Sequence, residues 1–90
     1  MSDTLQQELA GVRTEIDQID GELLQLLSRR ARCAQKVGAI KARHGEGGHI
    51  YRPEREAQVL RRIQASNAGP LTDEQVTWFF REVMSACLSL

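Results

Sequence analysis

The sequence has few residues of the kinds that build disulfide-linked, membrane-spanning or β-rich proteins. It holds two cysteines, two prolines and four aromatic residues in 90 positions. Cys33 and Cys87 are too few for a disulfide framework or a four-ligand metal site, which favours free thiols in a reducing compartment. No run approaches the length of about 18 apolar residues that a membrane span needs, and the start, MSDTLQQELAG, does not resemble a signal peptide. We therefore expect a cytoplasmic chain.

The sequence also lacks an excess of either charge. Twelve Lys plus Arg match twelve Asp plus Glu, so no global field attracts nucleic acid or an anionic membrane, and any anion site must be local. Ten of the twelve cations are Arg, whose planar guanidinium forms two-point contacts with carboxylates and phosphates. The abundance of Leu, Ala, Gln, Glu and Arg predicts an all-α fold, and 90 residues allow one domain over residues 1–90.

The first segment has apolar residues at alternating steps of four and three, which predicts one helix over about residues 5–43. The stripe consists of Leu5, Leu9, Val12, Ile16, Ile19, Leu23 and Leu26, and continues through Arg30, Cys33, Val37 and Ile40. Such a helix is nearly 60 Å long, whereas a 90-residue globule has a radius of gyration of about 12 Å. Because the helix must extend past any globule of its own chain, we infer a homodimer in which the long helices pair or interleave.

Two shorter helices follow a glycine-rich break. HGEGGH predicts a loop over residues 44–51, and its two histidines, His44 and His49, have no carboxylate at ligand spacing, so we expect no metal site. Pro53 suits the first turn of a helix over about residues 53–66. Thr72 and Gln75 form a capping-box pattern that predicts a third helix over about residues 72–90, and its apolar pattern leads us to expect continuation past the last residue.

Arg30 is the residue that departs from the apolar stripe, and an arginine there must be paired or must bind an anion. Lys41 lies 11 residues later, about 16 Å along the helix on nearly the same face. Ala34 and Gly38 lie between them, one turn apart, and are small enough to leave a shallow concavity between two cations. This arrangement favours a small anionic ligand.

Arg13 is the other candidate, but it lies about 25 Å from Arg30 along the helix, so one small ligand can touch both only if Arg13 comes from a partner subunit. Simpler roles stay open for both residues. Arg13 can pair with Asp17 one turn later, and Arg30 can pair with Glu15 or Glu56.

The remaining charged residues have no pattern that indicates chemistry. Glu56 and Arg55 lie in the first turns of the second helix, where a glutamate also complements the helix dipole. We expect surface positions for Arg29, Arg32, Arg43, Arg61, Arg62 and Arg81. No Ser, Cys or His has neighbours that mark an activated nucleophile.

The segments VRTEIDQIDGELLQLLSRR, AQKVGAIK, PEREAQVL and FFREVMSACL together resemble the all-helical (AroQ-type) chorismate mutase family over nearly the whole chain. The resemblance implies an intertwined homodimer of three-helix subunits, in which each site receives one arginine from the other subunit. It also implies the rearrangement of chorismate to prephenate in phenylalanine and tyrosine biosynthesis, without cofactor or proton transfer.

Carried over by position, the resemblance assigns a role to each candidate residue. Arg13 of the partner subunit and Arg30 would hold the substrate carboxylates, and Lys41 would donate to the ether oxygen. Glu56 would hold the ring hydroxyl, and Arg55 would be a secondary carboxylate contact.

Three positions depart from the family pattern. Arg52 stands where an aspartate is frequent in the family, so a contact to the hydroxyl side of the substrate must come from backbone or be lost. Cys87 replaces a serine or similar polar residue and is a weaker hydrogen-bond donor. The Gln or Glu that assists the lysine in the family would fall just beyond Leu90.

Two alternatives accompany this reading. An isochorismate–pyruvate lyase shares the fold and much of the cationic pocket, and only substrate tests separate the two enzymes. A non-catalytic helical dimerisation or regulatory module would have the same fold without turnover, and substitution of Arg30 or Lys41 would change only its stability. A nucleic-acid binder is disfavoured, because acids match the arginines and stacking aromatics are few.

Overall fold

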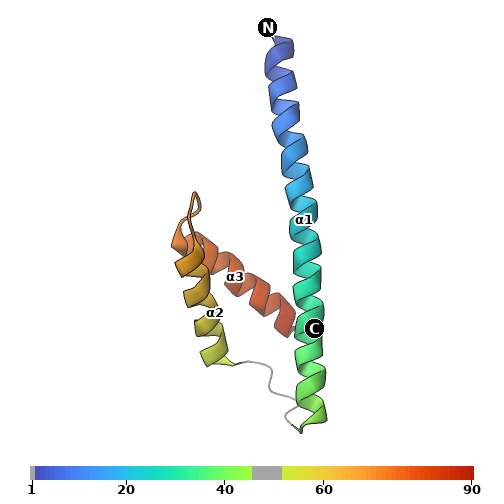
Figure 1. Cartoon of the computed structure of the whole chain (residues 1–90), viewed down its shortest axis with the longest axis vertical. Coiled ribbons are helices and arrows are strands. Elements are labelled where there is room, and N and C mark those ends of the chain that lie inside the picture. The colour runs from blue at the N-terminus through green and yellow to red at the C-terminus, as the bar shows by residue number, and fades with distance from the viewer. Residues whose placement is uncertain (1, 46–51) are drawn as a thin grey trace. The chain divides into compact units, whose positions relative to one another are not determined.

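The computed structural model describes residues 2–45 and 52–90, with helices in the order α1 (Ser2–Arg43), α2 (Pro53–Ser66) and α3 (Asp73–Leu88) (Figure 1). No strand occurs within these described ranges, and the prediction of an all-α fold is confirmed. Of the predicted loop over residues 44–51, all but His44 and Gly45 lies outside the described residues. The chain divides into two compact units, Met1–Arg30 and Ala31–Leu90.

Helix α1 contains 42 residues, begins three residues earlier than predicted and ends at the predicted residue, Arg43. Its end has the expected glycine signal. Gly45 has a φ of 77°, in the left-handed region that costs glycine little, and its N–H donates to the carbonyl of Ala42 at 3.2 Å. The glycine therefore satisfies one of the free carbonyl groups of the last turn.

The unit Met1–Arg30 is helical and has no apolar core among its described residues. Every described side chain from Asp3 to Leu27 is exposed. Nine large apolar side chains, each 37–65% exposed, belong to this unit: Leu5, Leu9, Val12, Ile16, Ile19, Leu23, Leu24, Leu26 and Leu27. Since an amphipathic helix gains most of its stability by packing such a stripe, the stripe needs a covering surface.

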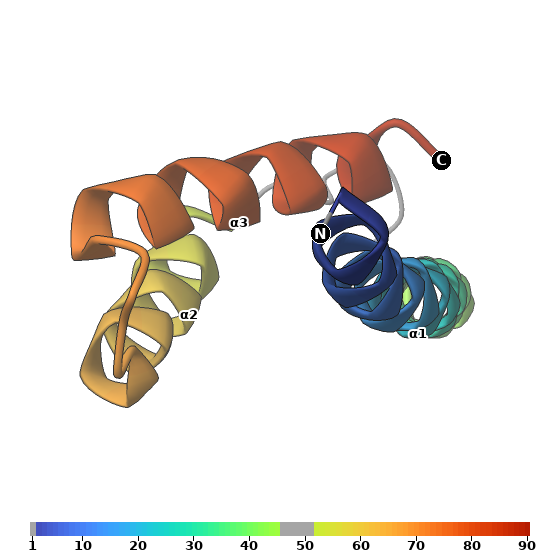
Figure 2. The ribbon, with the colours of Figure 1, turned by 90° about the horizontal axis from the view of Figure 1, so that it is seen from above.

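Within the unit Ala31–Leu90, α2 and α3 pack against each other as a helical hairpin (Figure 2). Among the described residues of this unit, Leu60 of α2 and Thr77 of α3 are the buried side chains, each 8% exposed. Gln64 Nε2 donates to Thr77 Oγ1 at 2.8 Å, and the Thr77 hydroxyl donates to the carbonyl of Asp73 at 2.7 Å. A polar side chain is thus buried with both its donor and its acceptor satisfied.

Asn67 organises the connection between α2 and α3. Its Nδ2 donates to the Leu71 carbonyl at 2.9 Å and to Asp73 Oδ1 at 2.8 Å, and its Oδ1 accepts from the Gly69 N–H at 3.1 Å. Gly69 has a φ of 78°, which a residue with a side chain rarely adopts. One amide side chain therefore holds the turn that fixes the hairpin.

The capping box at the start of α3 is present as predicted. The Gln75 N–H donates to Thr72 Oγ1 at 3.1 Å, and the Thr72 N–H donates to Gln75 Oε1 at 3.0 Å. The helix ends at Leu88, two residues before the predicted end. The final bonds, from Ser89 N–H to the Ala86 carbonyl and from Leu90 N–H to the Cys87 carbonyl, span three residues and form a turn.

Candidate active site

Helix α1 carries the two central cations of the candidate site. Arg30 and Lys41 are both half-buried, as are the two small residues between them, Ala34 and Gly38. Apart from its chain neighbours and the backbone of its own helix, a Cβ atom placed on Gly38 would meet nothing within 4 Å, so space lies open beside the helix at that point. The structure thus puts two cations and a small-residue floor on one helix, as the spacing predicts.

The first turn of α2 carries three more candidates. Arg52 is the N-cap residue and makes no side-chain capping bond, while Pro53 occupies the first helical position. The Glu56 N–H donates to the Arg52 carbonyl at 3.0 Å, and the Glu56 side chain is half-buried. Arg55 is exposed, and its Nη1 donates to Gln58 Oε1 at 2.6 Å. Glu56 is therefore the first-turn acid that is partly withdrawn from solvent, whereas Arg55 has a local partner one turn away.

The two thiols differ in exposure. Cys87 lies on α3, is half-buried and forms no disulfide bond, while Cys33 on α1 is an exposed free thiol. Sequence periodicity places Cys87 toward the apolar side of its helix, and half-burial agrees with that position. The ligand-binding role that the resemblance implies for Cys87 stays a prediction.

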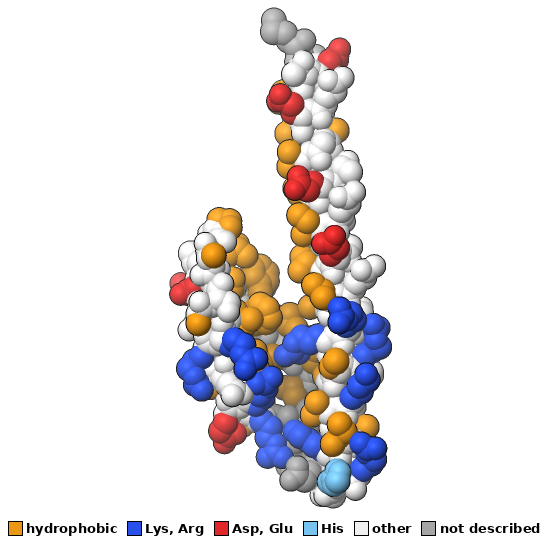
Figure 3. Space-filling view, viewed as in Figure 1, with side chains coloured by type: hydrophobic (Ala, Val, Ile, Leu, Met, Phe, Trp, Pro, Cys, Tyr) orange, Lys and Arg blue, Asp and Glu red, His pale blue; other side chains and the backbone are white. Residues whose placement is uncertain are grey.

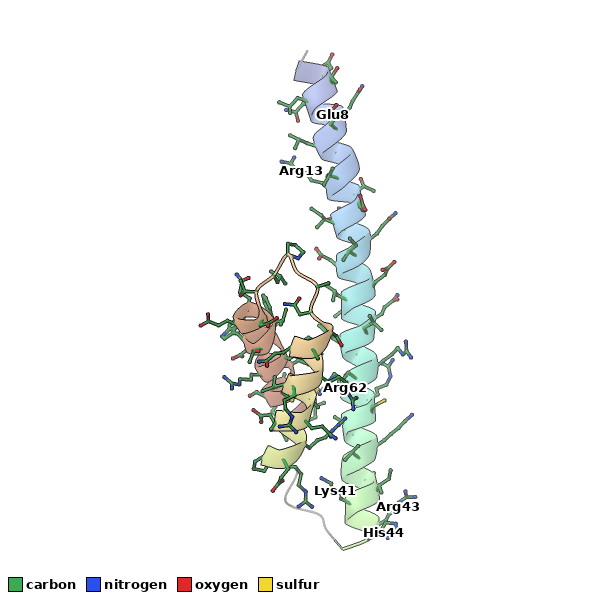
Figure 4. All side chains as sticks on the ribbon, turned by 60° about the vertical axis from the view of Figure 1, so that its left-hand side comes forward. Glu8, Arg13, Lys41, Arg43, His44 and Arg62 are labelled. Atoms are coloured by element: carbon green, nitrogen blue, oxygen red, sulfur yellow. The ribbon has the colours of Figure 1, made fainter. Side chains whose placement is uncertain are left out.

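Arg13 lies in the N-terminal half of α1 and Lys41 near its end (Figure 4). Arg13 is exposed, and no ion pair with Asp17 is among the interactions of the described residues. Arg13 and Lys41 are 28 positions apart, which corresponds to about 42 Å of helix. One small ligand cannot touch both residues of the same chain.

The other arginines are exposed, as predicted for surface positions: Arg29, Arg32, Arg43, Arg61, Arg62 and Arg81. Three of these arginines share one face of α1 with Lys36, which the sequence analysis did not recognise. The four cations are Arg29, Arg32, Lys36 and Arg43. Their separations of three, four and seven residues put them on one face of the helix. This spacing can be read from the sequence and predicts the shared face.

Neither a candidate metal centre nor a candidate membrane span is found among the described residues. No cluster of three or more His, Cys, Asp or Glu that could hold a metal lies within residues 2–45 and 52–90, and His49 is outside these ranges. Among the described helices, none combines the length and hydropathy that a membrane span requires.

Comparison with known proteins identifies the family. A family model described as chorismate mutase type II matches residues 12–90. A bifunctional chorismate mutase/prephenate dehydratase of Pseudomonas aeruginosa is 50% identical over 88 residues, which cover 94% of this chain and 24% of that protein. A protein with the same description from Neisseria gonorrhoeae is 51% identical over all of this chain and 24% of its own length. This chain thus spans about a quarter of these curated relatives.

A solved structure agrees with the sequence comparison. The structure of chorismate mutase (form II) from Thermus thermophilus superposes with a TM-score of 0.87 at 35% identity, covering 92% of both chains. The match extends over nearly all of this three-helix chain. The chain therefore belongs to the chorismate mutase type II family.

Proposed function

We propose that residues 1–90 form a chorismate mutase domain that converts chorismate to prephenate without a cofactor. The observation that carries this proposal is the half-buried pair of Arg30 and Lys41 on α1, with open space beside Gly38 between them, in a chain of the chorismate mutase type II family. Neither cysteine forms a disulfide bond, which fits a cytoplasmic enzyme.

The reaction is an intramolecular rearrangement of a dicarboxylate, so the protein needs no nucleophile. Arg30 holds one substrate carboxylate through its planar guanidinium and thereby favours the compact conformer in which the reacting carbons meet. Negative charge develops on the ether oxygen as its bond to the ring breaks. The Lys41 ammonium stabilises that charge more strongly in the transition state than in the ground state, which is the condition for acceleration.

Glu56 completes the proposed site at the ring hydroxyl of the substrate. A half-buried carboxylate accepts a hydrogen bond from a hydroxyl group and makes the site selective for a substrate that carries one. Arg55 is a secondary carboxylate contact in this proposal, and binding there would replace its bond to Gln58. Arg52 offers its backbone, and Cys87 offers a weak donor from α3.

We propose a homodimer as the working form. The nine exposed apolar side chains of Met1–Arg30 form a stripe that a second α1 can cover, with coiled-coil-like spacing. Along α1, acidic side chains gather in the N-terminal half and basic ones in the C-terminal third (Figure 3). Antiparallel pairing lays opposite charges together, whereas parallel pairing lays like charges together, so charge favours the antiparallel arrangement.

The same pairing explains how Arg13 can serve the site. An antiparallel pair of α1 helices with its midpoint near residue 21 brings Arg13 of the partner subunit beside Arg30. That register also places the partner's Asp3 and Glu8 level with about residues 34–40 along the helix axis, within the basic C-terminal third of α1. Two independent features, the arginine spacing and the charge distribution, therefore favour one register.

A turnover assay tests the proposed reaction. Purified chain is incubated with chorismate and, in parallel, with isochorismate, and the products are identified by chromatography. We expect prephenate from chorismate, a loss of about 10²- to 10³-fold in kcat for Lys41→Ala, and little change for the control Arg81→Ala, which removes an exposed cation of α3. Pyruvate from isochorismate alone would replace the proposal with the lyase, and a folded dimer inert toward both would replace it with a scaffold.

A further inference from the structure

Helix α1 carries six cations between residues 29 and 43 and no acid between residues 23 and 45, in a chain whose formal charge is zero. Two of the six, Arg30 and Lys41, belong to the proposed site. The other four define a cationic strip: Arg29, Arg32, Lys36 and Arg43. Nothing in the proposed chemistry uses these four.

The strip lies on a different face of α1 from the site. At 3.6 residues per turn its four members fall within an arc of about 60°, centred roughly 140° from Arg30 and Lys41. Figure 4 shows Lys41 and Arg43 leaving the helix in opposite directions. Burial separates the same groups, since all four strip residues are exposed whereas Arg30 and Lys41 are half-buried. The strip is therefore exposed in this chain and points away from a ligand held by Arg30 and Lys41.

The strip is close enough to act on that ligand through its field. It spans about 21 Å of helix, and it is separated from the site face by a helix about 10–12 Å across. The Debye length is about 8 Å at 0.15 M salt and about 30 Å at 0.01 M, so the strip and a bound anion interact appreciably at low ionic strength and weakly at high ionic strength. The interaction energy of a dianion with each of the four charges is twice that of a monoanion at the same distance.

We infer that the cationic strip is an electrostatic device that concentrates dianionic substrate at the site; this inference rests on the proposed function. The substrate has two carboxylates in the ground state and in the transition state, so the field stabilises both equally. Uniform stabilisation lowers KM and leaves kcat unchanged. The strip therefore sets the affinity and the association rate, while Arg30 and Lys41 perform the chemistry.

The acidic half of α1 does not cancel the strip. Its heptad-spaced acids Glu8, Glu15 and Glu22 flank the apolar stripe, so in the proposed antiparallel dimer they lie near the helix seam. The strip lies on the face away from the seam. Acids of the partner lower the absolute potential, yet removal of four cations changes that potential by the same amount with or without them.

The test compares kcat and KM for chorismate across ionic strength in the variant Arg29→Gln/Arg32→Gln/Lys36→Gln/Arg43→Gln. Glutamine keeps good helix propensity and removes only the charge. At about 10 mM ionic strength we expect kcat/KM to fall roughly five- to tenfold through KM, with kcat within about twofold of wild type. At about 0.5 M the two proteins should differ by less than about twofold.

A charge-preserving control separates a field from a specific contact. Arg29→Lys/Arg32→Lys/Lys36→Arg/Arg43→Lys keeps all four charges and changes every donor geometry, and we expect wild-type KM at each salt concentration. Two double variants, Arg29→Gln/Arg32→Gln and Lys36→Gln/Arg43→Gln, serve if the fourfold variant does not fold, each with about half the logarithmic effect.

The outcomes are distinguishable. Equal KM in wild type and fourfold variant at low salt would overturn the inference, and so would a loss that does not shrink as salt is added. Both results leave the proposed function intact, because wild type still forms prephenate. A wild-type chain that forms no prephenate contradicts the proposed function itself.

Discussion

Gln64 and Thr77 join α2 to α3 through a hydrogen bond of 2.8 Å between Gln64 Nε2 and Thr77 Oγ1. Thr77 is 8% exposed and also donates to the Asp73 carbonyl, so its buried hydroxyl both accepts and donates a hydrogen bond within the hairpin. We expect Thr77→Val, which keeps shape and removes the hydroxyl, to lower the free energy of unfolding by about 1–3 kcal/mol, since Gln64 loses its acceptor. Urea unfolding at fixed protein concentration measures this. Thr14→Val makes the same change at an exposed position of α1 and should stay within about 0.5 kcal/mol of wild type.

The capping box gives a second stability prediction. Thr72→Ala removes the acceptor for the Gln75 N–H and should cost about 0.5–2 kcal/mol in the free energy of unfolding. Thr72→Ser keeps a hydroxyl at the same position and should retain most of that stability. If the serine variant loses as much stability as the alanine variant, the cap bond is not the cause.

Dimerisation through the apolar stripe of α1 is tested by Ile16→Glu. Ile16 is 49% exposed in the chain, and the proposed dimer buries it, so a charge there should weaken association roughly 100- to 1,000-fold. Sedimentation velocity should show a dimer for wild type and a monomer for the variant at micromolar concentration. Gln18→Glu adds the same charge on the opposite face of α1 and should remain dimeric. A monomeric wild-type chain, or a dimer unaffected by Ile16→Glu, contradicts this interface.

Glu54 and Glu56 are a matched pair for separating a helix-dipole role from a substrate role. Both lie in the first turn of α2, where either carboxylate favours the helix, but Glu54 is exposed and Glu56 is half-buried. We expect Glu56→Ala to lower kcat/KM for chorismate about 10- to 100-fold through loss of a charged acceptor, and Glu54→Ala to leave it unchanged. If both variants lose the same small amount of helix stability and turn over chorismate at the same rate, the role of Glu56 is limited to its favourable interaction with the helix dipole.

The sequence predicts the helices well because their information is local. The four-and-three stripe defines α1 to Arg43, Pro53 begins α2, and the Thr72–Gln75 box begins α3. The end of α3 is less predictable. The apolar pattern continues through Leu88, but no glycine, asparagine or proline marks the helix end. At Ser89 the backbone N–H bonds to the carbonyl three residues earlier, in place of the four-residue bond of an α-helix.

The candidate site is predictable only in part, for a physical reason. Arg30 stands out because it interrupts an apolar stripe, and its half-burial agrees with that position. The hydrogen bond between Gln64 and Thr77 joins positions 13 residues apart on different helices, so no local sequence pattern predicts it. The shared helix face of the cationic strip can be predicted, since it depends on helical spacing alone. The structure adds that these four cations are exposed whereas Arg30 and Lys41 are half-buried.

The central claim, a mutase site shared between two copies of α1, is tested most directly by a purified heterodimer of Arg13→Ala and Lys41→Ala subunits carrying different affinity tags. Each homodimeric variant should be nearly inactive. In the heterodimer, one site combines an intact Arg13 with an intact Lys41 from the other subunit, so we expect about half of the wild-type rate of prephenate formation per dimer. If Arg13 serves the site of its own chain, no site is intact, and a heterodimer as inactive as its parents would contradict the account.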